Sequence, residues 1–359
     1  MIWTQVDSLL SIIDLEIFFA YGSFKWTNVA KHKAGVTCSI IGVSNINKSI
    51  KLIYKGEKRR EVKSINSYLT SGKNYIICRR RKSLSNLPTI TLGDMPRDNG
   101  HLVLLPEEKN KLLNTYPKSE KYLRRFIGAY DFLKGEKRWC LWVRENEYHE
   151  ALKIPFIKKR FELVSKFRLS SKKIPTQEFS KKPYRFVEIR KQEKPAIIIP
   201  STTSENRPYI PLGFVNKEVI IANSIHVIYG PPTYLFAIIS SRLHMIWMRT
   251  VAGRLENRYR YSSDLVYNNF PFLEINQNQK KLLEEKVFKV LDEREKYSEK
   301  TLAELYAFGK MPKTLLKSHE EMDETVESCY DVKPFSDDNE RLEYLFNVYE
   351  KMNEKGNLI

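Results

Sequence analysis

The 359-residue sequence contains few cysteines and no long apolar run, and each shortage excludes a class of protein. No run of 18 apolar residues occurs, so no transmembrane helix is predicted. The first residues lack the basic start and small-residue cleavage site of a secretory signal. The cysteines lie far apart without a C-x-x-C pair, which favours neither a disulfide framework nor a zinc knuckle. We therefore expect a cytoplasmic protein with no membrane partner.

Glycine is also scarce, and none of it forms the turns that bind cofactors or nucleotides. A methyltransferase that uses S-adenosylmethionine needs a glycine-rich turn after its first strand, and a P-loop needs G-x-x-x-x-G-K-[ST]. Neither pattern occurs here. Methylation of a DNA amino group requires an Asn/Asp/Ser-Pro-Pro-aromatic loop, but Gly230–Thr233 has glycine in front of its two prolines and threonine behind them. We interpret this segment as a helix start that Thr233 can cap.

Other catalytic patterns are equally sparse. Glu188–Lys191 has the acidic residue and lysine of a metal-dependent nuclease, but no aspartate lies at a suitable distance upstream. The six histidines are isolated, and we expect His244 to be a hydrogen-bonded side chain at an interface and Cys140 to pack in a core. On its motifs the chain is not a complete enzyme: we predict no catalytic residue, no metal site and no cofactor bound by this chain alone.

Positive charge is abundant and unevenly distributed. Lysine and arginine number 61 against 43 aspartates and glutamates, a net charge of +18. Residues 275–359 hold 14 basic and 19 acidic side chains, which leaves 47 and 24 in residues 1–274. The stretch 151–194 alone has 14 basic and 4 acidic side chains. We expect a separate acidic unit at the C-terminal end, and a polyanionic partner, nucleic acid in the first place, for the rest.

Apolar patterning predicts a mixed α+β fold. Short apolar runs indicate strands at 14–20, 35–43, 102–105, 138–143, 184–189, 196–200 and 219–222. Helical spacing indicates helices at 152–170, after Thr233, and at 277–297, 299–308, 313–330 and 337–352. Residues 134–137 are interpreted as a hairpin turn. The first two strands have no evident partners and resemble the trailing edge of a sheet begun elsewhere.

The segment Ser201–Tyr209, called the polar loop below, is the best candidate for reading DNA bases. It lies between apolar strands and contains side-chain types that hydrogen-bond to base edges. An ordinary hairpin loop is the alternative interpretation. The base-reading candidates are Ser204, Glu205, Asn206 and Arg207.

Two basic clusters are candidates for phosphate contacts. One follows the helix after Thr233 and joins arginines to tyrosine and serine hydroxyls, which suits phosphate oxygens. The other belongs to the 151–194 stretch and suits salt-sensitive, non-specific attraction. A merely solvated face is the alternative for the first cluster. The phosphate candidates are Arg254, Arg258 and Arg260 in the first cluster, and Lys181, Lys182 and Arg185 in the second.

The order of these pieces resembles the MmeI-like DNA methyltransferases, a type II restriction–modification group that joins cleavage, adenine methylation and recognition in one chain. Phe19–Trp26 with Ala34–Val36 and Ile40–Gly42 resembles the last methyltransferase motif. Ser204–Phe214 is similar to the target-recognition domain. Further stretches are similar to the segments that follow in the family: 65–69, 93–102, 124–128, 138–142, 259–262, 267–271, 302–306 and 311–312.

The resemblance implies four parts: a methyltransferase edge (1–50), a connecting β-rich segment (51–149), a DNA target-recognition domain of mixed α/β structure (150–272) and a C-terminal helical bundle (273–359). It implies that Phe24 and Trp26 lie beside a base flipped out of the duplex, with core packing as the alternative. It also implies double-stranded DNA as partner, adenine as target, and S-adenosylmethionine as cofactor of the complete enzyme. The cofactor turn, the Asn-Pro-Pro-aromatic loop and any nuclease domain are absent from this sequence.

Three functional hypotheses follow. The first is a sequence-specific DNA-recognition part of an adenine methyltransferase from a restriction–modification or phage-defence system, inactive by itself. The second is a split subunit that reconstitutes methylation with a separately encoded catalytic chain, which could also carry a nuclease. The third is an RNA-binding protein, since basic charge with aromatics suits single strands, although no RNA-binding signature is present.

Overall fold

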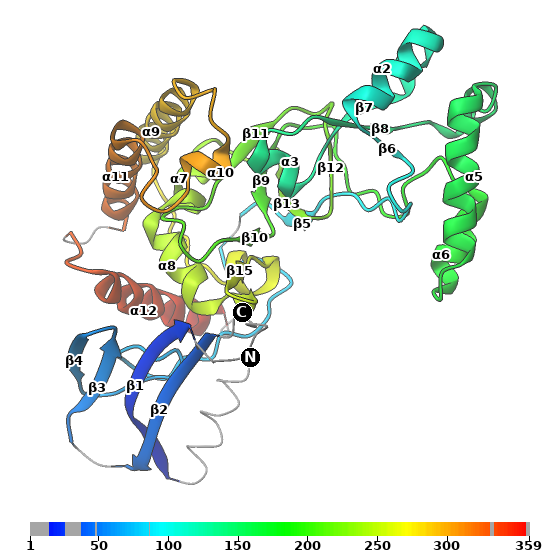
Figure 1. The fold of residues 1–359 in the computed structure, drawn as a ribbon. Coiled ribbons are helices and arrows are strands. Elements are labelled where there is room, and N and C mark those ends of the chain that lie inside the picture. The colour runs from blue at the N-terminus through cyan, green and yellow to red at the C-terminus, as the bar shows by residue number, and fades with distance from the viewer. Residues whose placement is uncertain (1–13, 26–36, 47–48, 86, 331–333, 357–359) are drawn as a thin grey trace.

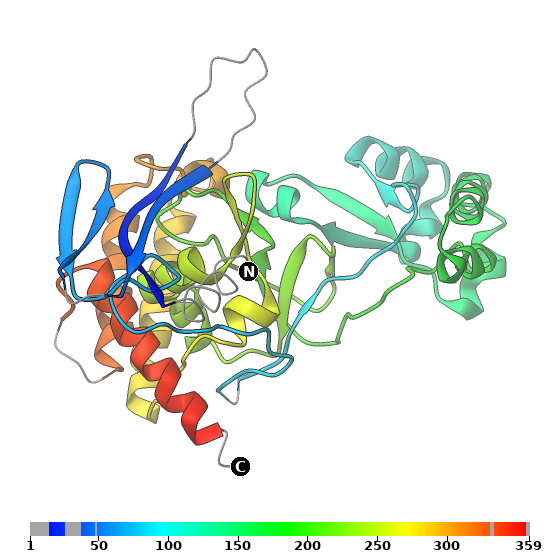
Figure 2. The same cartoon turned by 90° about the horizontal axis from the view of Figure 1, so that it is seen from below.

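The structure is a computed structural model that describes residues 14–25, 37–46, 49–85, 87–330 and 334–356. It shows small sheets, a helical region and an outer lobe at the far end of the molecule from the first sheet (Figures 1 and 2). The mixed α+β class predicted from the sequence is confirmed. Among the described residues, no helix combines the length and the apolar character needed to cross a membrane.

The first sheet has the strand order β2-β1-β3-β4. Strand β1 pairs antiparallel with β2 and parallel with β3, so the predicted first two strands are present and the sheet extends beyond them. A small core beneath it contains Ile17, Ala20, Val62 and Ile65. The strand bounds are β1 Leu15–Lys25, β2 Thr37–Asn45, β3 Lys51–Lys55 and β4 Lys58–Val62.

The central sheet, with order β11-β9-β13-β5, is buried on both faces. Along β9, Ile197 and Ile199 face the main core, whereas Ala196 and Ile198 face a smaller one. Alternate residues of a strand point to opposite faces, so a strand covered on both sides needs a continuous apolar run. The bounds are β5 Ile90–Leu92, β9 Ala196–Pro200, β11 Gly213–Val215 and β13 Ile225–Tyr229.

The outer lobe is built on the sheet β12-β7-β8-β6 and has its own core, in which Phe126, Cys140, Phe161 and Phe186 are buried. Cys140 is fully buried, as expected. Strands of the lobe are β6 Val103–Leu104, β7 Leu123–Ile127, β8 Arg138–Leu141 and β12 Ile220–Ile221. Its α-helices are α2 Pro106–Thr115, α4 Tyr148–Ala151, α5 Pro155–Leu169 and α6 Ile174–Glu178, and its 3₁₀-helices are Pro117–Tyr122, Glu145–Glu147 and Phe179–Lys181. The helix α3 Ala129–Lys134 lies beside the central sheet, where Ala129 and Phe132 pack against the smaller core (Figure 1).

The C-terminal helices are present as predicted, and their apolar faces belong to the main core. They share the main core with α7 and α8: Trp247 of α8 packs against Phe346 and Tyr349 of α12. The acidic composition therefore marks a different surface rather than a different core. The helices are α7 Tyr234–Ser240, α8 Arg242–Val251, α9 Gln277–Glu295, α10 Leu302–Leu305, α11 Lys313–Ser328 and α12 Asp338–Gly356, with a π-helical turn at Ser263–Tyr267.

Two local predictions were wrong. No strand forms at 184–189, because Tyr184 and Phe186 are buried in the outer lobe and the carbonyl oxygen of Arg185 accepts a hydrogen bond from the Arg168 guanidinium. Residues 134–137 are not a hairpin turn: Lys134 ends α3, and Gly135 closes the helix in the left-handed conformation at φ 70°.

The helix start after the two prolines was right, with two differences. The Thr233 side chain makes no capping hydrogen bond, and the helix breaks at Ser241, whose side chain caps α8. Strand β13 was not predicted, since its apolar run follows the predicted strand 219–222 after only two residues.

Candidate nucleic-acid interface

The polar loop lies between two fixed points. At its start β10 (Thr202–Thr203) pairs antiparallel with β15 (Arg258–Arg260), which in turn pairs with β14 (Gly253–Leu255). At its end the Tyr209 side chain is buried. Between them Asn206 is exposed, and Ser204, Glu205 and Arg207 are half-buried. The pairing places all four base-reading candidates beside the strands that carry the first arginine cluster.

Two hydrogen bonds hold Arg207, and neither of them is with a carboxylate. Its Nη1 donates to Oγ1 of Thr203 at 3.4 Å, and its carbonyl oxygen accepts from Nη2 of Arg249 at 2.9 Å. Burial lowers the pKa of the guanidinium, and no carboxylate among the described residues offsets this effect. A guanidinium without an acidic partner keeps its donors for an external acceptor, and guanine O6 and N7 form such an acceptor pair.

The strands β14 and β15 form a hairpin, called the arginine hairpin below. Arg254 lies over the Tyr259 ring at 4.4 Å and donates to the Tyr259 hydroxyl and to the carbonyl of Asn257. Arg258 pairs with Glu256 at 3.0 Å. Arg254, Arg258 and Arg260 are all exposed. The hairpin therefore presents three arginines next to the polar loop, as phosphate contacts would require.

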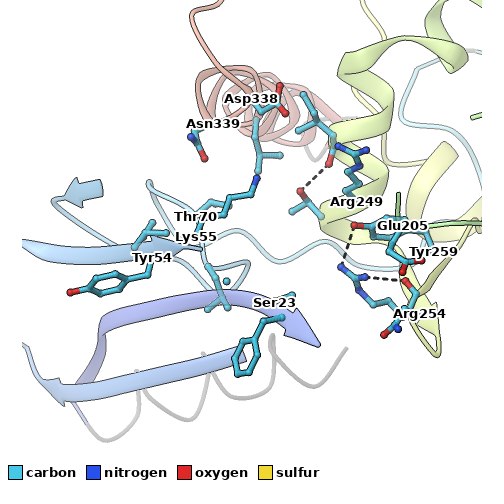
Figure 3. A pocket seen from close by; sticks show the side chains of 18 residues that line it. Ser23, Tyr54, Lys55, Thr70, Glu205, Arg249, Arg254, Tyr259, Asp338 and Asn339 are labelled. Atoms are coloured by element: carbon cyan, nitrogen blue, oxygen red, sulfur yellow. Dashed lines mark hydrogen bonds between the residues drawn. The ribbon is translucent and has the colours of Figure 1, made fainter. Parts of the chain in front are cut away.

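A cleft of about 430 Å³, called the central cleft below, separates the first sheet from the polar loop and α8. Phe24 at the end of β1 lines it on one side, and Glu205 and Arg254 line it on the other. Figure 3 shows Ser23 on the β1 side and Glu205, Arg254 and Tyr259 close together on the opposite side. The structure thus brings one aromatic candidate, one base-reading candidate and one phosphate candidate to one cavity. Trp26 lies outside the described residues.

The second basic cluster lies elsewhere. Lys181, Lys182 and Arg185 are exposed on the outer lobe, beside α5 and α6 rather than at the central cleft. Lys182 pairs with Glu145 at 3.2 Å, and this hydrogen bond lowers the pKa of the Glu145 carboxyl. The structure therefore divides the candidates into a cleft set and an outer-lobe set.

A single buried arginine fixes the backbone of the outer-lobe set. Arg168 of α5 is fully buried, and its five N–H groups donate to five backbone carbonyls. Burial lowers its pKa to about 10. The carbonyls belong to Pro96, Arg97, Phe179, Lys182 and Arg185 at 2.7–3.0 Å. Nothing in the sequence singled out Arg168 among its basic neighbours.

The cleft also contains residues that were not selected from the sequence. Lys55 at the end of β3 and Arg249 of α8 line it, and both are labelled in Figure 3. Arg249 stands at the head of the first arginine cluster, so the composition around it was a usable signal. Lys55 lay in a short basic strand without any such signal.

Two glycines of the first sheet pack closely against neighbouring groups. In the first sheet, a Cβ on Gly42 would meet the Phe19 ring at 2.2 Å, and one on Gly22 would meet the Tyr54 carbonyl at 3.3 Å. These two glycines make room for packing within the sheet. No group of three His, Cys, Asp or Glu side chains gathers as metal ligands among the residues described.

His244 behaves as expected from the sequence. It is buried, its Nε2 bonds to the Tyr261 hydroxyl at 2.9 Å, and burial lowers its pKa to about 3. His226 is also buried; its Nδ1 bonds to the Ser201 hydroxyl at 3.1 Å, and burial lowers its pKa to about 4. Both imidazoles are neutral packing groups at neutral pH.

Three family models match the sequence. Residues 71–274 match the target recognition domain of MmeI, residues 275–356 its C-terminal domain, and residues 1–55 its DNA-methyltransferase domain. The first of these matches alone covers more than half of the chain.

Two relatives extend this result. DNA methyltransferase A of Bacillus subtilis (strain 168) is 39% identical over 342 residues, which are 95% of this chain and 39% of that protein. The type IIL restriction–modification enzyme MmeI, solved in complex with DNA, is 38% identical with a TM-score of 0.89, over 98% of this chain and 48% of that one. The chain thus spans less than half the length of each of these relatives.

Proposed function

The chain belongs to the MmeI family of DNA methyltransferases, and from this premise we propose that it is the sequence-specific DNA-recognition part of an adenine methyltransferase from a restriction–modification system. The observation that carries the proposal is the central cleft, where Phe24 of the methyltransferase edge meets Glu205 of the polar loop and Arg254 of the arginine hairpin. DNA bound in this cleft would contact the polar loop, which reads bases, and the methyltransferase edge with Phe24, which lies beside the flipped base.

Arg207 and its neighbours read the sequence in this proposal. Arg207 reads guanine through two parallel hydrogen bonds, Asn206 suits adenine, and Glu205 accepts from the cytosine amino group. Ser204 hydrogen-bonds to either kind of base edge. These assignments of bases to side chains follow from the side-chain chemistry and from the lack of an acidic partner for Arg207 among the described residues.

In this proposal, the exposed arginines and lysines bind the DNA backbone. Arg254, Arg258 and Arg260 contact phosphates beside the loop, while Lys181, Lys182 and Arg185 attract DNA to the outer lobe irrespective of sequence. Phe24 stacks on the flipped base or on the gap that it leaves, with Trp26 as the second aromatic.

The second candidate function is that of a split subunit, and the first sheet favours it. Strand β2 is at the edge of the sheet, and among the described residues no strand pairs with its other side. Ile40 and Val43 of this strand are half exposed, at 48% and 50%. The unpaired backbone N–H and C=O groups of such an edge strand accept a further strand, and the exposed side chains offer it apolar surface on the faces of the sheet. A separate catalytic chain with the cofactor turn and the Asn-Pro-Pro-aromatic loop would complete the sheet there.

In either case S-adenosylmethionine would be bound by the complete enzyme, because the glycine-rich cofactor turn is absent from this sequence. We therefore propose that the chain alone binds DNA in the cytoplasm and transfers no methyl group. A separate chain that bears the catalytic loop would supply this activity, and any nuclease activity as well.

Titration of fluorescent duplex DNA tests the proposal. Labelled duplexes from a random pool are titrated with the chain across a salt series, with total RNA as competitor, and bound duplexes are sequenced. Tight binding that survives RNA and enriches one short sequence supports the proposal. Binding that RNA removes would favour the RNA-binding alternative, and binding without an enriched sequence would show that the charge attracts any duplex.

A further inference from the structure

The end of the polar loop is anchored in the C-terminal helices. Tyr209 is 5% exposed, and its hydroxyl donates to Oδ2 of Asp323 in α11 at 2.7 Å. Its ring stacks on the His319 ring of the same helix, with centroids 4.3 Å apart and planes at 18°. Tyr209 follows Arg207 by only two residues, so this contact fixes the loop close to its best base-reading candidate.

Asp323 joins the loop to α8 as well as to α11. Its second oxygen, Oδ1, accepts from the backbone N–H of Arg242, the first residue of α8, at 2.8 Å. At the other end of α8, Arg249 donates to the carbonyl oxygen of Arg207. One helix is therefore tied to the loop near both of its ends, through Asp323 at its start and through Arg249 in its last turn.

A second bond holds the chain just beyond Tyr209. Nη1 of Arg294 in α9 donates to the carbonyl oxygen of Leu212 at 2.7 Å, and Nε donates to the Tyr306 hydroxyl at 2.6 Å. The Tyr306 hydroxyl also bonds to Nε2 of His319 at 2.8 Å. A continuous polar network thus runs from α9 through His319 to the ring of Tyr209.

From this network we infer that Tyr209 and Asp323 are positioning residues for sequence reading: the C-terminal helices hold the polar loop so that Arg207 and its neighbours meet the base edges in one geometry. The inference rests on the proposed function and deepens it, because it assigns the helical part a role in specificity. Hydrogen bonds to base edges depend on direction, whereas attraction to phosphates depends little on it. A loosened loop therefore lowers the preference for one DNA sequence more than it lowers the affinity for random duplex.

Tyr209→Phe is the test variant, since it removes only the hydroxyl. The matched control is Tyr330→Phe, which removes another buried hydroxyl from the same core; that group donates to the carbonyl of Pro271 at 3.1 Å and contacts no part of the loop. Asp323→Asn is the conservative companion, because an amide keeps one oxygen for the two donors that the carboxylate accepts. All variants are made in the full chain.

Two readouts separate positioning from stability. The first is the ratio of the affinity for the enriched duplex to that for random duplex. We expect Tyr209→Phe to lower this ratio roughly tenfold, Asp323→Asn to lower it less, and Tyr330→Phe to leave it unchanged. The second is hydrogen exchange of residues 201–212 without DNA, which should accelerate in Tyr209→Phe and not in the control.

The outcomes distinguish this inference from the proposed function. An unchanged ratio in Tyr209→Phe, or an equal fall in Tyr330→Phe, overturns the inference and leaves the proposed function standing. If the parent chain shows no sequence preference, the proposed function fails and the assignment of the pair to sequence reading fails with it; faster exchange in Tyr209→Phe would then establish only a mechanical clamp on the loop.

Discussion

The central cleft and the outer lobe are both basic, but the base-reading candidates lie in the polar loop beside the cleft. Glu205 lines the cleft, and Arg207 lies two residues further along the same loop, which is held at both ends and also carries amide and hydroxyl side chains. On the outer lobe, Lys181 and Lys182 are exposed lysines on a segment whose backbone Arg168 fixes. The difference teaches that charge density alone does not locate a reading site; the polar groups and their anchoring do.

The largest expected effect is on the outer lobe alone. Arg168→Met leaves five buried carbonyls without their donor, which we expect to destabilise this lobe by roughly 3–5 kcal/mol. Hydrogen exchange should accelerate in residues 96–186, whereas residues 196–210 should keep their protection because they belong to other cores. Equal acceleration in both regions would show that the two cores unfold together.

Lowering the pH should destabilise the main core and the central sheet, which contain the buried histidines, before it destabilises the outer lobe. The pKa of His226 in the folded chain, about 4, lies below its ordinary value near 6.5, so its stabilisation is complete above pH 6.5 and is lost as pH falls toward 4. This loss is about 3 kcal/mol. Burial also lowers the pKa of His244 and of His319, and neither they nor His226 belong to the described core of the outer lobe.

Asp323 opposes this trend but does not reverse it. Burial raises the pKa of the Asp323 carboxyl from 3.8 to about 7. Its contribution to the free energy of unfolding is therefore complete below pH 3.8 and is lost as the pH rises through 7. Calorimetry between pH 4 and 7.5 should therefore show a net gain in stability with pH, and His226→Gln should reduce the slope. A parent chain that is most stable at pH 4 would contradict the buried neutral histidines.

The variant Arg207→Ala tests whether the polar loop beside the cleft reads one base position. We expect a loss of about 1–3 kcal/mol at one base position and little loss on random duplex. Arg207→Lys keeps the charge but cannot form two parallel bonds, so it should lose discrimination at the same position. Arg258→Ala is the matched control from the neighbouring hairpin and should weaken all duplexes alike. Titrations against duplexes with single base changes measure these differences.

The smallest effect is expected from Lys182→Ala. Its partner Glu145 already offsets part of its charge, so the affinity for any duplex should fall by less than about 1 kcal/mol and the salt slope by about one unit. The sequence preference should stay the same. A base-specific loss in this variant would place reading on the outer lobe and refute the comparison.

Short-range signals explain which elements could be predicted. The apolar run of β9, the two prolines before α7 and the helical spacing of apolar residues in the C-terminal helices act within a few residues, and these elements formed as predicted. At 184–189 a distant residue decided the outcome, because Arg168 takes the carbonyl of Arg185 and local β propensity is overridden. The hairpin turn predicted at 134–137 was wrong for a local reason, because Lys134 ends a short helix and Gly135 closes that helix.

The candidate site divides in the same way. The polar loop and the arginines that follow α8 were identified from composition, and the structure brings them together through the pairing of β10 with β15. The anchoring of Tyr209 by Asp323 could not be predicted, because 114 residues separate the partners and each is an ordinary residue of its own segment. Pairs at that separation are decided by how α11 packs against α7 and α8.

Selection from a random duplex pool tests the central claim most directly, with three proteins compared: the parent chain, Arg207→Ala, and the triple variant Lys181→Ala/Lys182→Ala/Arg185→Ala. The account predicts that the triple variant binds more weakly but enriches the sequence that the parent enriches, whereas Arg207→Ala relaxes one position of it. An unchanged sequence with Arg207→Ala, together with an altered one in the triple variant, would contradict the account.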